Sequence, residues 1–259
     1  MALFDILAPV LSLFDDMIEP FTSVLIRLAF WACIAALISS VVFKKLSNPE
    51  KINALKIKLK IMQDQLNQHD GEFAELKDLA INTIKLSLKR MVLTFIPALL
   101  ASVPIIFLLT YLSNRYELHE PAVNEVVQIT INWEKLDANN TVSIFNRDKL
   151  IKKQNVNSIT WPEKNQVLRL IDNTTDIEVL IFPSAISGII HKKKWWNSLI
   201  GNPAGYLAEG SSISSIELNY KQQQIISFGP KWLRGWLLLF FFMTLVFSIA
   251  FIFIFKIRF

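Results

Sequence analysis

The side chains most often used in catalysis and metal binding are sparse in this chain. Its three histidines, His69, His119 and His191, are scattered, and its single cysteine, Cys33, lies in an apolar segment. The sequence contains no cluster with metal-ligand spacing, no phosphate-binding loop and no nucleophile motif. It therefore predicts a protein that is not an enzyme and that uses no metal ion and no cofactor.

A second set of polar side chains interrupts long apolar segments, where a charge is costly unless it has a partner. Ala98 and Ser102 follow Thr94 at intervals of four residues, and Ser248 follows Thr244 at the same interval. Residues four apart share a face of a helix, so each segment has one small or polar stripe. Such residues also mediate ordinary helix packing in membranes, and this alternative stays open. The polar set comprises Arg27, Ser39, Ser40, Thr94, Ser102, Thr244 and Ser248.

Three segments are long and apolar enough to cross a bilayer as helices. They are residues 21–43, 91–112 and 232–255, and a helix of about 20 residues covers a hydrocarbon core of roughly 30 Å. Hydrophobic residues make up 52% of the chain and charged residues 19%. This composition is typical of an integral membrane protein rather than a soluble one.

Lysine and arginine residues near the spans predict the orientation of the chain. Residues 44–90 hold ten basic residues, whereas the first 21 residues hold none and carry four acidic ones. Because basic flanks resist translocation, the N-terminus is predicted outside and residues 44–90 in the cytosol. Residues 113–231 then lie outside, and the tail 256–259 returns to the cytosol.

The cytosolic segment 44–90 has the regular spacing of an antiparallel coiled-coil hairpin. Ser47 or Asn48 can cap a first helix, with Pro49 in its first turn. Residues 69–71 then break the pattern, and a second helix returns to the membrane. The apolar seam of the first arm is Ile52, Leu55, Leu59, Met62 and Leu66, and that of the second arm is Phe73, Leu76, Ala80, Ile84 and Leu88.

The residue pattern of the outer segment 113–231 predicts a separate β-rich domain. Short runs of β-branched and aromatic residues recur between turn residues and predict strands. These runs are EVVQITINW, TVSIFN, SITW, QVLRLI, IEVLIF, SSIELNY and QQIISF, the last two forming a pair around Lys221.

One run of basic and aromatic residues does not fit this pattern of β-strands. Lys192, Lys193 and Lys194 are followed by Trp195 and Trp196. Lysine and tryptophan suit a membrane interface or the acidic surface of a partner better than a protein core. Specific nucleic-acid binding is not expected of a run that lies outside the cytosol.

The first 20 residues are too short and too acidic to span a membrane. Their apolar residues fit a short amphipathic element on the outer surface, broken or started near Pro9. A simple helical entry into the first span is the alternative.

The order of these parts resembles the Oxa/YidC membrane-insertase superfamily. The likeness is to its small archaeal YidC-like members and to the insertase subunit of the endoplasmic-reticulum membrane protein complex. It covers the helical parts of the chain and leaves the outer β-rich domain without a counterpart. The segments that carry the likeness are FDILAPVLSLF, ALISSVVFKKLSNPEKINALKIKLKIMQDQL, LKRMVLTFIPALLASVPIIFLL and WLRGWLLLFFFMTLVFSIAFIFIFKIRF.

The resemblance implies a polar groove among three helices, through which the polar flank of a client crosses a thinned bilayer. Its wall would be formed by the polar set, because a polar wall lowers the cost of a polar segment in hydrocarbon. Arg27 would close the outer end of this groove. The alternative for Arg27 is a side chain that extends to the outer headgroups.

The same resemblance implies the partners and the location of the protein. The partners are the lipid bilayer, nascent membrane proteins, ribosomes and other membrane subunits, and the location is the cytoplasmic (inner) membrane of a prokaryote. Lysines that only solvate the hairpin, or hold it against anionic lipid, are the alternative to client binding. The implied contacts with clients or ribosomes are Lys51, Lys56, Lys58, Lys60 and Met62.

The sequence leaves two other functions open. The first is a non-enzymatic scaffold or assembly subunit that binds its partners through the outer β-rich domain. The second is an ion-leak channel, which needs a continuous polar path, whereas the outer halves of these spans are apolar except at Arg27.

Overall fold

The computed structural model describes residues 2–135, 141–146, 149–153, 157–163, 168–182 and 187–256. The chain forms two compact units, each built from two separate stretches of sequence. We call Ser23–Leu108 with Leu239–Phe259 the helical unit, and Met1–Thr22 with Leu109–Leu238 the sandwich unit. The predicted tail beyond Lys256 lies outside the described residues.

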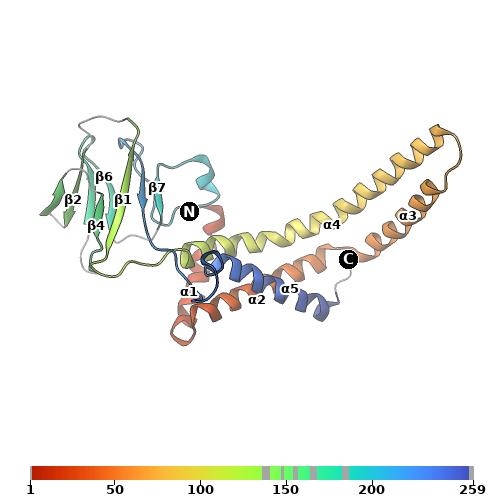
Figure 1. Cartoon of the computed structure of the whole chain (residues 1–259), viewed down its shortest axis with the longest axis horizontal. Coiled ribbons are helices and arrows are strands. Elements are labelled where there is room, and N and C mark those ends of the chain that lie inside the picture. Colours follow the sequence, from red (N-terminus) through yellow and green to blue (C-terminus); the bar gives the residue numbers. More distant parts are fainter. Residues whose placement is uncertain are drawn as a thin grey trace. The chain divides into compact units, whose positions relative to one another are not determined.

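Four long helices supply the helical unit (Figure 1). They are α2 (Val24–Leu46), α3 (Pro49–Asn67), α4 (Phe73–Tyr116) and α5 (Trp236–Phe255). The side chain of Asn48 caps α3 by accepting a hydrogen bond from the Lys51 amide at 3.1 Å, and Pro49 occupies the first turn as predicted.

Three of these helices, α2, α4 and α5, are long and apolar enough to cross a membrane. This finding agrees with the three predicted spans and with an integral membrane protein. The helix α4 runs unbroken for 44 residues and contains both Pro97 and Pro104. The second hairpin arm and the second span are therefore one continuous helix.

Small residues on α2 bring its neighbours close. Ala32, Ala35 and Ala36 are buried, and the Ser39 hydroxyl donates to the Ala101 carbonyl of α4 at 2.9 Å. Near the other end of α2, the Lys44 ammonium lies 5.6 Å from the centre of the Phe255 ring of α5. Small side chains permit such close approach, which is the usual basis of helix packing in membranes.

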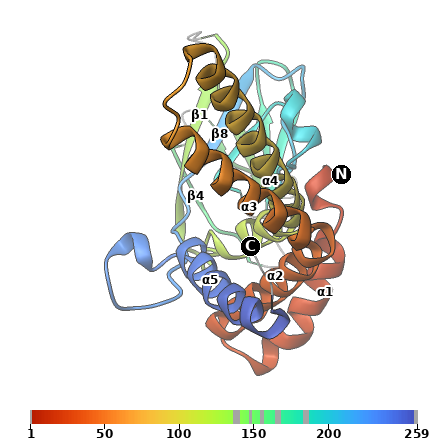
Figure 2. The ribbon, with the colours of Figure 1, turned by 90° about the vertical axis from the view of Figure 1, so that its right-hand side faces the viewer.

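The helix α3 folds back beside the first half of α4, and Figure 2 shows the two side by side. Ile52 and Leu59 of the predicted first seam are buried. The predicted seam of the second arm is wrong for three residues, since Phe73 is 79% exposed and Ile84 and Leu88 are also exposed. The covered face of this arm contains Leu76, Leu79, Ala80 and Thr83. The coiled coil itself stays a prediction.

The sandwich unit contains two four-stranded antiparallel sheets. One sheet has the order β4-β1-β8-β7 and the other has the order β3-β2-β5-β6. The strands are β1 (Val126–Trp133), β2 (Val142–Asn146), β3 (Lys149–Lys153), β4 (Ser158–Thr160), β5 (Leu168–Asp172), β6 (Ile177–Phe182), β7 (Ile189–His191) and β8 (Ile213–Leu218). Six of the predicted strand runs are confirmed by these elements.

The last predicted strand is wrong. Gln223 to Phe228 form irregular backbone, and the expected hairpin around Lys221 is replaced by an isolated bridge between Leu118 and Gln222. The strands β3 and β7 were not predicted. The strand β7 contains two adjacent isoleucines and therefore shows no alternating pattern.

One hydrophobic core joins the two sheets. Ile129, Ile213 and Ile216 come from one sheet, and Ile144 and Leu170 come from the other, and all five belong to a single buried cluster. Because both inner faces contribute to one core, the two sheets pack face to face as a β-sandwich.

The buried carboxylate of Asp172 links the end of β5 to the segment just before β8 through hydrogen bonds. It accepts hydrogen bonds from the Thr174 amide at 2.9 Å and from the Thr175 hydroxyl at 2.7 Å. It also accepts from the Ser211 hydroxyl at 3.1 Å and from the amide and hydroxyl of Ser212, both at 2.8 Å. Burial raises the pKa of Asp172, but the bonds from Thr175, Ser212 and Thr174 outweigh burial and lower the pKa to about 2.

The N-terminal helix α1 (Ala8–Ile18) belongs to the sandwich unit and has Pro9 in its first turn. Its Asp15 is fully buried, and the Tyr116 hydroxyl at the end of α4 lies 2.7 Å from both carboxylate oxygens. Arg115 contacts Asp15 at 3.4 Å and pairs with Asp16 and Glu19 at 2.7 and 2.9 Å. These polar contacts fix the inner face of α1 to the end of α4.

The opposite face of α1 is apolar and exposed. Val10, Leu13, Phe14 and Met17 recur at helical spacing and are uncovered. The helix thus presents its apolar side chains outward while it buries a charge. This inverted pattern is unfavourable in water and is what a surface in contact with lipid requires.

Candidate functional site

Arg27 lies in the first turn of α2 and is buried, with 5% of its surface exposed. A side chain that reached the headgroups along the lipid-facing surface of the helix would be exposed in this structure. The burial of Arg27 therefore favours the interior position over the snorkelling alternative.

Two of the predicted hydroxyl groups lie in the packed interior of the helical unit. Ser40 on α2 and Thr244 on α5 are both 8% exposed. The Thr244 hydroxyl has no hydrogen-bond partner among the described residues, whereas Ser39 donates to Ala101 of α4. A buried hydroxyl without a partner is costly, so Thr244 offers an unused polar group inside an apolar set of helices.

The predicted stripe on α4 lies beside its packed face rather than on it. Thr94 donates to the Arg90 carbonyl and Ser102 donates to the Leu99 carbonyl, both within the same helix. Ala98 between them is exposed, while Pro97 and Ala101 are buried. Packing within this chain therefore does not explain the stripe.

The structure brings these polar residues together only in part. Ser248 is half-buried one turn beyond Thr244 on α5. Ser39 reaches α4 one residue from Ser102. No hydrogen bond joins the hydroxyl groups of Ser39, Ser40, Thr94, Ser102, Thr244 and Ser248 to one another in the described part of the chain.

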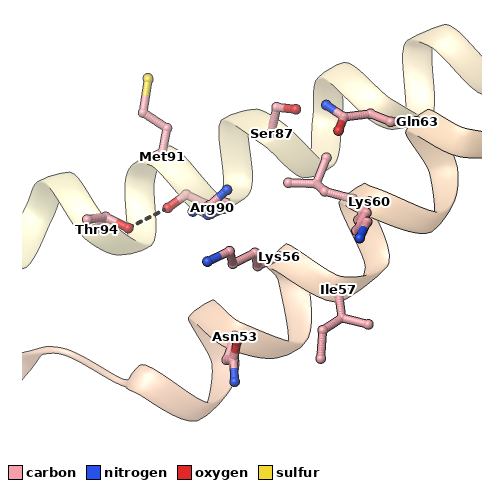
Figure 3. A pocket seen from close by; sticks show the side chains of 10 residues that line it. Asn53, Lys56, Ile57, Lys60, Gln63, Ser87, Arg90, Met91 and Thr94 are labelled. Atoms are coloured by element: carbon pink, nitrogen blue, oxygen red, sulfur yellow. Dashed lines mark hydrogen bonds between the residues drawn. The ribbon is translucent and has the colours of Figure 1, made fainter. Parts of the chain in front are cut away.

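A cavity of about 630 Å³, which we call the hairpin cavity, opens between α3 and α4 (Figure 3). Lys56 reaches from α3 into the space between the helices, beside Arg90 of α4. The residues that line the hairpin cavity are Asn53, Lys56, Ile57, Leu59, Lys60 and Gln63 of α3, and Ser87, Arg90, Met91 and Thr94 of α4. This cavity brings two predicted contact lysines together with Thr94 of the predicted groove.

The hairpin cavity is positively charged. Lys56, Lys60 and Arg90 line it, and its lining contains no acidic residue. None of these three side chains forms an ion pair or donates a hydrogen bond within the described residues. Ser87 and Arg90 were not predicted as site residues, although Arg90 follows Ser87 by three residues and Thr94 follows Arg90 by four, which places all three on one helix face.

The remaining predicted contacts of the first arm lie elsewhere. Lys51 and Lys58 are exposed and do not line the cavity, and Met62 is half-buried. Lys58 lies two residues from both Lys56 and Lys60, which turns it about 200° away from each on the helix. The predicted set therefore divides between the cavity and the outer face of α3.

The basic and aromatic run of the sandwich unit is also divided. The Lys192 ammonium donates to Glu134 at 2.6 Å and to the Ser211 carbonyl at 2.7 Å, so it is engaged within the sandwich unit, and its contact with a membrane or partner stays a prediction. Lys193 is exposed, and the Lys194 ammonium lies 4.8 Å from the centre of the Trp196 ring.

Trp195 is 82% exposed and begins the short 3-10 helix η3 (Trp195–Ser198). The segment after η3 is tied to the N-terminus, because the Phe4 amide donates to the Leu199 carbonyl and the Gly201 amide donates to Asp5. A Cβ atom on residue 201 would collide with the Asp5 carboxylate, so this contact favours glycine. Leu3, Ile6, Trp195 and Ile200 thus add to the exposed apolar surface of the unit.

Comparison with known proteins adds no family assignment. The chain matches no protein-family model, no curated protein and no solved structure. Within the described residues, no group of three or more histidine, cysteine, aspartate or glutamate side chains could hold a metal ion.

Proposed function

We propose that this chain is a membrane protein insertase or chaperone of the Oxa/YidC type, which eases the polar flanks of clients across the bilayer. One observation carries the proposal. Helices of membrane length bury Arg27, Ser40 and an unpartnered Thr244 hydroxyl instead of a purely apolar interface. A client's polar group could exchange water for these groups at a lower cost than for lipid.

Client contact can be tested with a photo-crosslinking amino acid at Ser102 or Ser248 in ribosome-bound nascent chain complexes. Both positions are half-buried beside the polar groups. We expect them to crosslink nascent membrane proteins several-fold more than Leu99 and Leu245, which are exposed neighbours on the same helices. Thr244→Val, which keeps the shape but removes the hydroxyl, should weaken the crosslink from Ser248.

Equal crosslinking from all four positions would contradict a client path. Crosslinks only to fixed neighbouring proteins, independent of translation, would support the scaffold function instead. The exposure of Trp195 on the sandwich unit favours that second candidate, because an uncovered tryptophan is a common anchor of protein interfaces.

The proposal includes a topology with the hairpin in the cytosol and the sandwich unit outside, in a prokaryotic cytoplasmic membrane. Single cysteines in a Cys33→Ala background test it. With a membrane-impermeant maleimide on intact cells, Thr130→Cys on β1 should react at once, and Lys58→Cys on α3 only after permeabilisation. Both side chains are exposed in the structure, so accessibility through the membrane alone decides the result. The reverse order of labelling would invert the topology.

A further inference from the structure

The hairpin cavity is lined by positive charges and by no acidic side chain. Lys56 and Lys60 lie one turn apart on α3, and Arg90 faces the same cavity from α4. Three cations around one cavity repel one another, and no acidic side chain lines the cavity to relieve this repulsion. An anion bound among them would remove that cost.

The neutral lining residues extend the chemistry of the site. Asn53, Gln63 and Ser87 add hydrogen-bond donors. The Arg90 guanidinium has a planar fork of donors that matches two oxygens of one phosphate. The Thr94 hydroxyl donates its proton to the Arg90 backbone carbonyl at 3.1 Å. The cavity therefore suits a phosphate group better than a single carboxylate.

The cavity also has an apolar side at the start of a membrane-length stretch. Leu59, Ile57 and Met91 line it, and Met91 and Thr94 begin the apolar stretch of α4 predicted to enter the membrane. Phosphates of lipid headgroups lie at the height where such a stretch enters the bilayer. The volume of about 630 Å³ is in the usual range for a small-molecule site.

We propose that the hairpin cavity binds a phosphate group, supplied by the headgroup of an anionic lipid in the adjacent leaflet. Lys56, Lys60 and Arg90 neutralise the phosphate, and Ile57, Leu59 and Met91 contact the glycerol region. A lipid held there orders α3 against α4 at the membrane surface. This site is independent of the insertase proposal, since a scaffold could use the same lipid contact.

The test is a titration of the purified full chain in detergent with phosphatidylglycerol or phosphatidylcholine, followed by native mass spectrometry. We expect preferential retention of phosphatidylglycerol. Lys56→Gln, Lys60→Gln or Arg90→Gln should each weaken it roughly fivefold, as expected for loss of one basic contact with an anionic lipid. The matched controls Lys58→Gln and Lys85→Gln change the same charge on the same helices outside the cavity and should have little effect.

Two further results separate the possible sources of the phosphate. If millimolar inorganic phosphate leaves the lipid bound, the lipid is the ligand, and if it displaces the lipid in the wild type, the cavity is a site for free phosphate. Equal losses in the control and cavity variants would overturn the proposal, because they would show only general surface attraction. Retention of RNA by these three side chains, with no preference between the lipids, would overturn it as well.

Discussion

Asp172→Ala is expected to unfold the sandwich unit at temperatures where the wild type stays folded. The substitution removes the acceptor of five hydrogen bonds and leaves donors on the buried Ser211 and the half-buried Ser212 unpaired. Such a loss costs about 3–5 kcal/mol, which is a large part of the stability of a domain. Thermal unfolding of the full chain, followed by near-ultraviolet circular dichroism and by limited proteolysis of residues 113–231, measures it.

The control for this prediction is Glu209→Ala. Glu209 is an exposed carboxylate in the turn just before Ser211, so its loss should leave the melting temperature nearly unchanged. Similar melting curves for Asp172→Ala and the wild type would show that the buried carboxylate does not hold the two sheets together.

Asp172 also makes the stability of the sandwich unit dependent on pH. Its pKa is about 2 in the folded chain, below the ordinary value of 3.8, so the folded state binds the proton more weakly than the unfolded state does. The resulting stabilisation, about 2 kcal/mol, is fully present above pH 4 and is lost as the pH falls from 4 to 2. Asp172→Asn should remove this part of the acid dependence, which a comparison of both proteins across that range would reveal.

Tyr116→Phe is expected to release α1 from the end of α4. The Tyr116 hydroxyl is a neutral donor to the fully buried Asp15 carboxylate, and its removal should cost about 1.5–3 kcal/mol because the acceptor is charged. Hydrogen exchange of the backbone amides in Ala8–Ile18, measured on the protein in nanodiscs, should rise by one to two orders of magnitude.

A double variant separates this polar contact from simple packing. With Asp15→Leu added to Tyr116→Phe, no buried carboxylate lacks its donor, and most of the exchange protection should return. Tyr206→Phe removes a tyrosine hydroxyl elsewhere in the same unit and should leave α1 protected. An α1 that exchanges equally in the wild type and in Tyr116→Phe would mean that its apolar contacts alone hold it.

The features that the sequence predicted well are those with a strong and local signal. Long apolar segments predicted α2, the second half of α4 and α5, because about 20 consecutive apolar residues are rare in helices that do not cross a membrane. Alternating runs predicted β1, β2, β5, β6 and β8 in the same way. The cap at Asn48 followed from residue types at fixed offsets.

The sequence-based predictions fail where one helix offers more than one apolar face, or where two residues in contact are distant in sequence. Ile84 and Leu88 fit a seam by spacing, but Leu79 and Leu86 offer a second apolar stripe at helical spacing, and the buried Thr83 lies on that stripe. Spacing alone therefore does not identify the covered face. Asp172 is followed by Asn173 and two threonines, a local turn signal, yet nothing in the sequence links it to Ser212 forty residues away.

The same distinction between local signals and tertiary contacts applies to the candidate site. The basic residues of the hairpin and the hydroxyl groups of the spans were visible as residue types at helical spacing. The sequence alone did not show which of these residues lie together. The fold places Lys56 and Lys60 in a cavity with Arg90 and leaves Lys58 outside it. The burial of Arg27 likewise depends on tertiary packing.

The contact between Asp15 and Tyr116 has a consequence for biosynthesis. The two residues are 101 positions apart, and at about 5–20 residues per second the ribosome needs roughly 5–20 s to pass from one to the other. During that interval α1 has emerged but its polar face has no Tyr116 or Arg115 to bind. Docking of α1 can therefore occur only after the whole of α4 has been translated, and it marks the moment at which the second long apolar helix is complete.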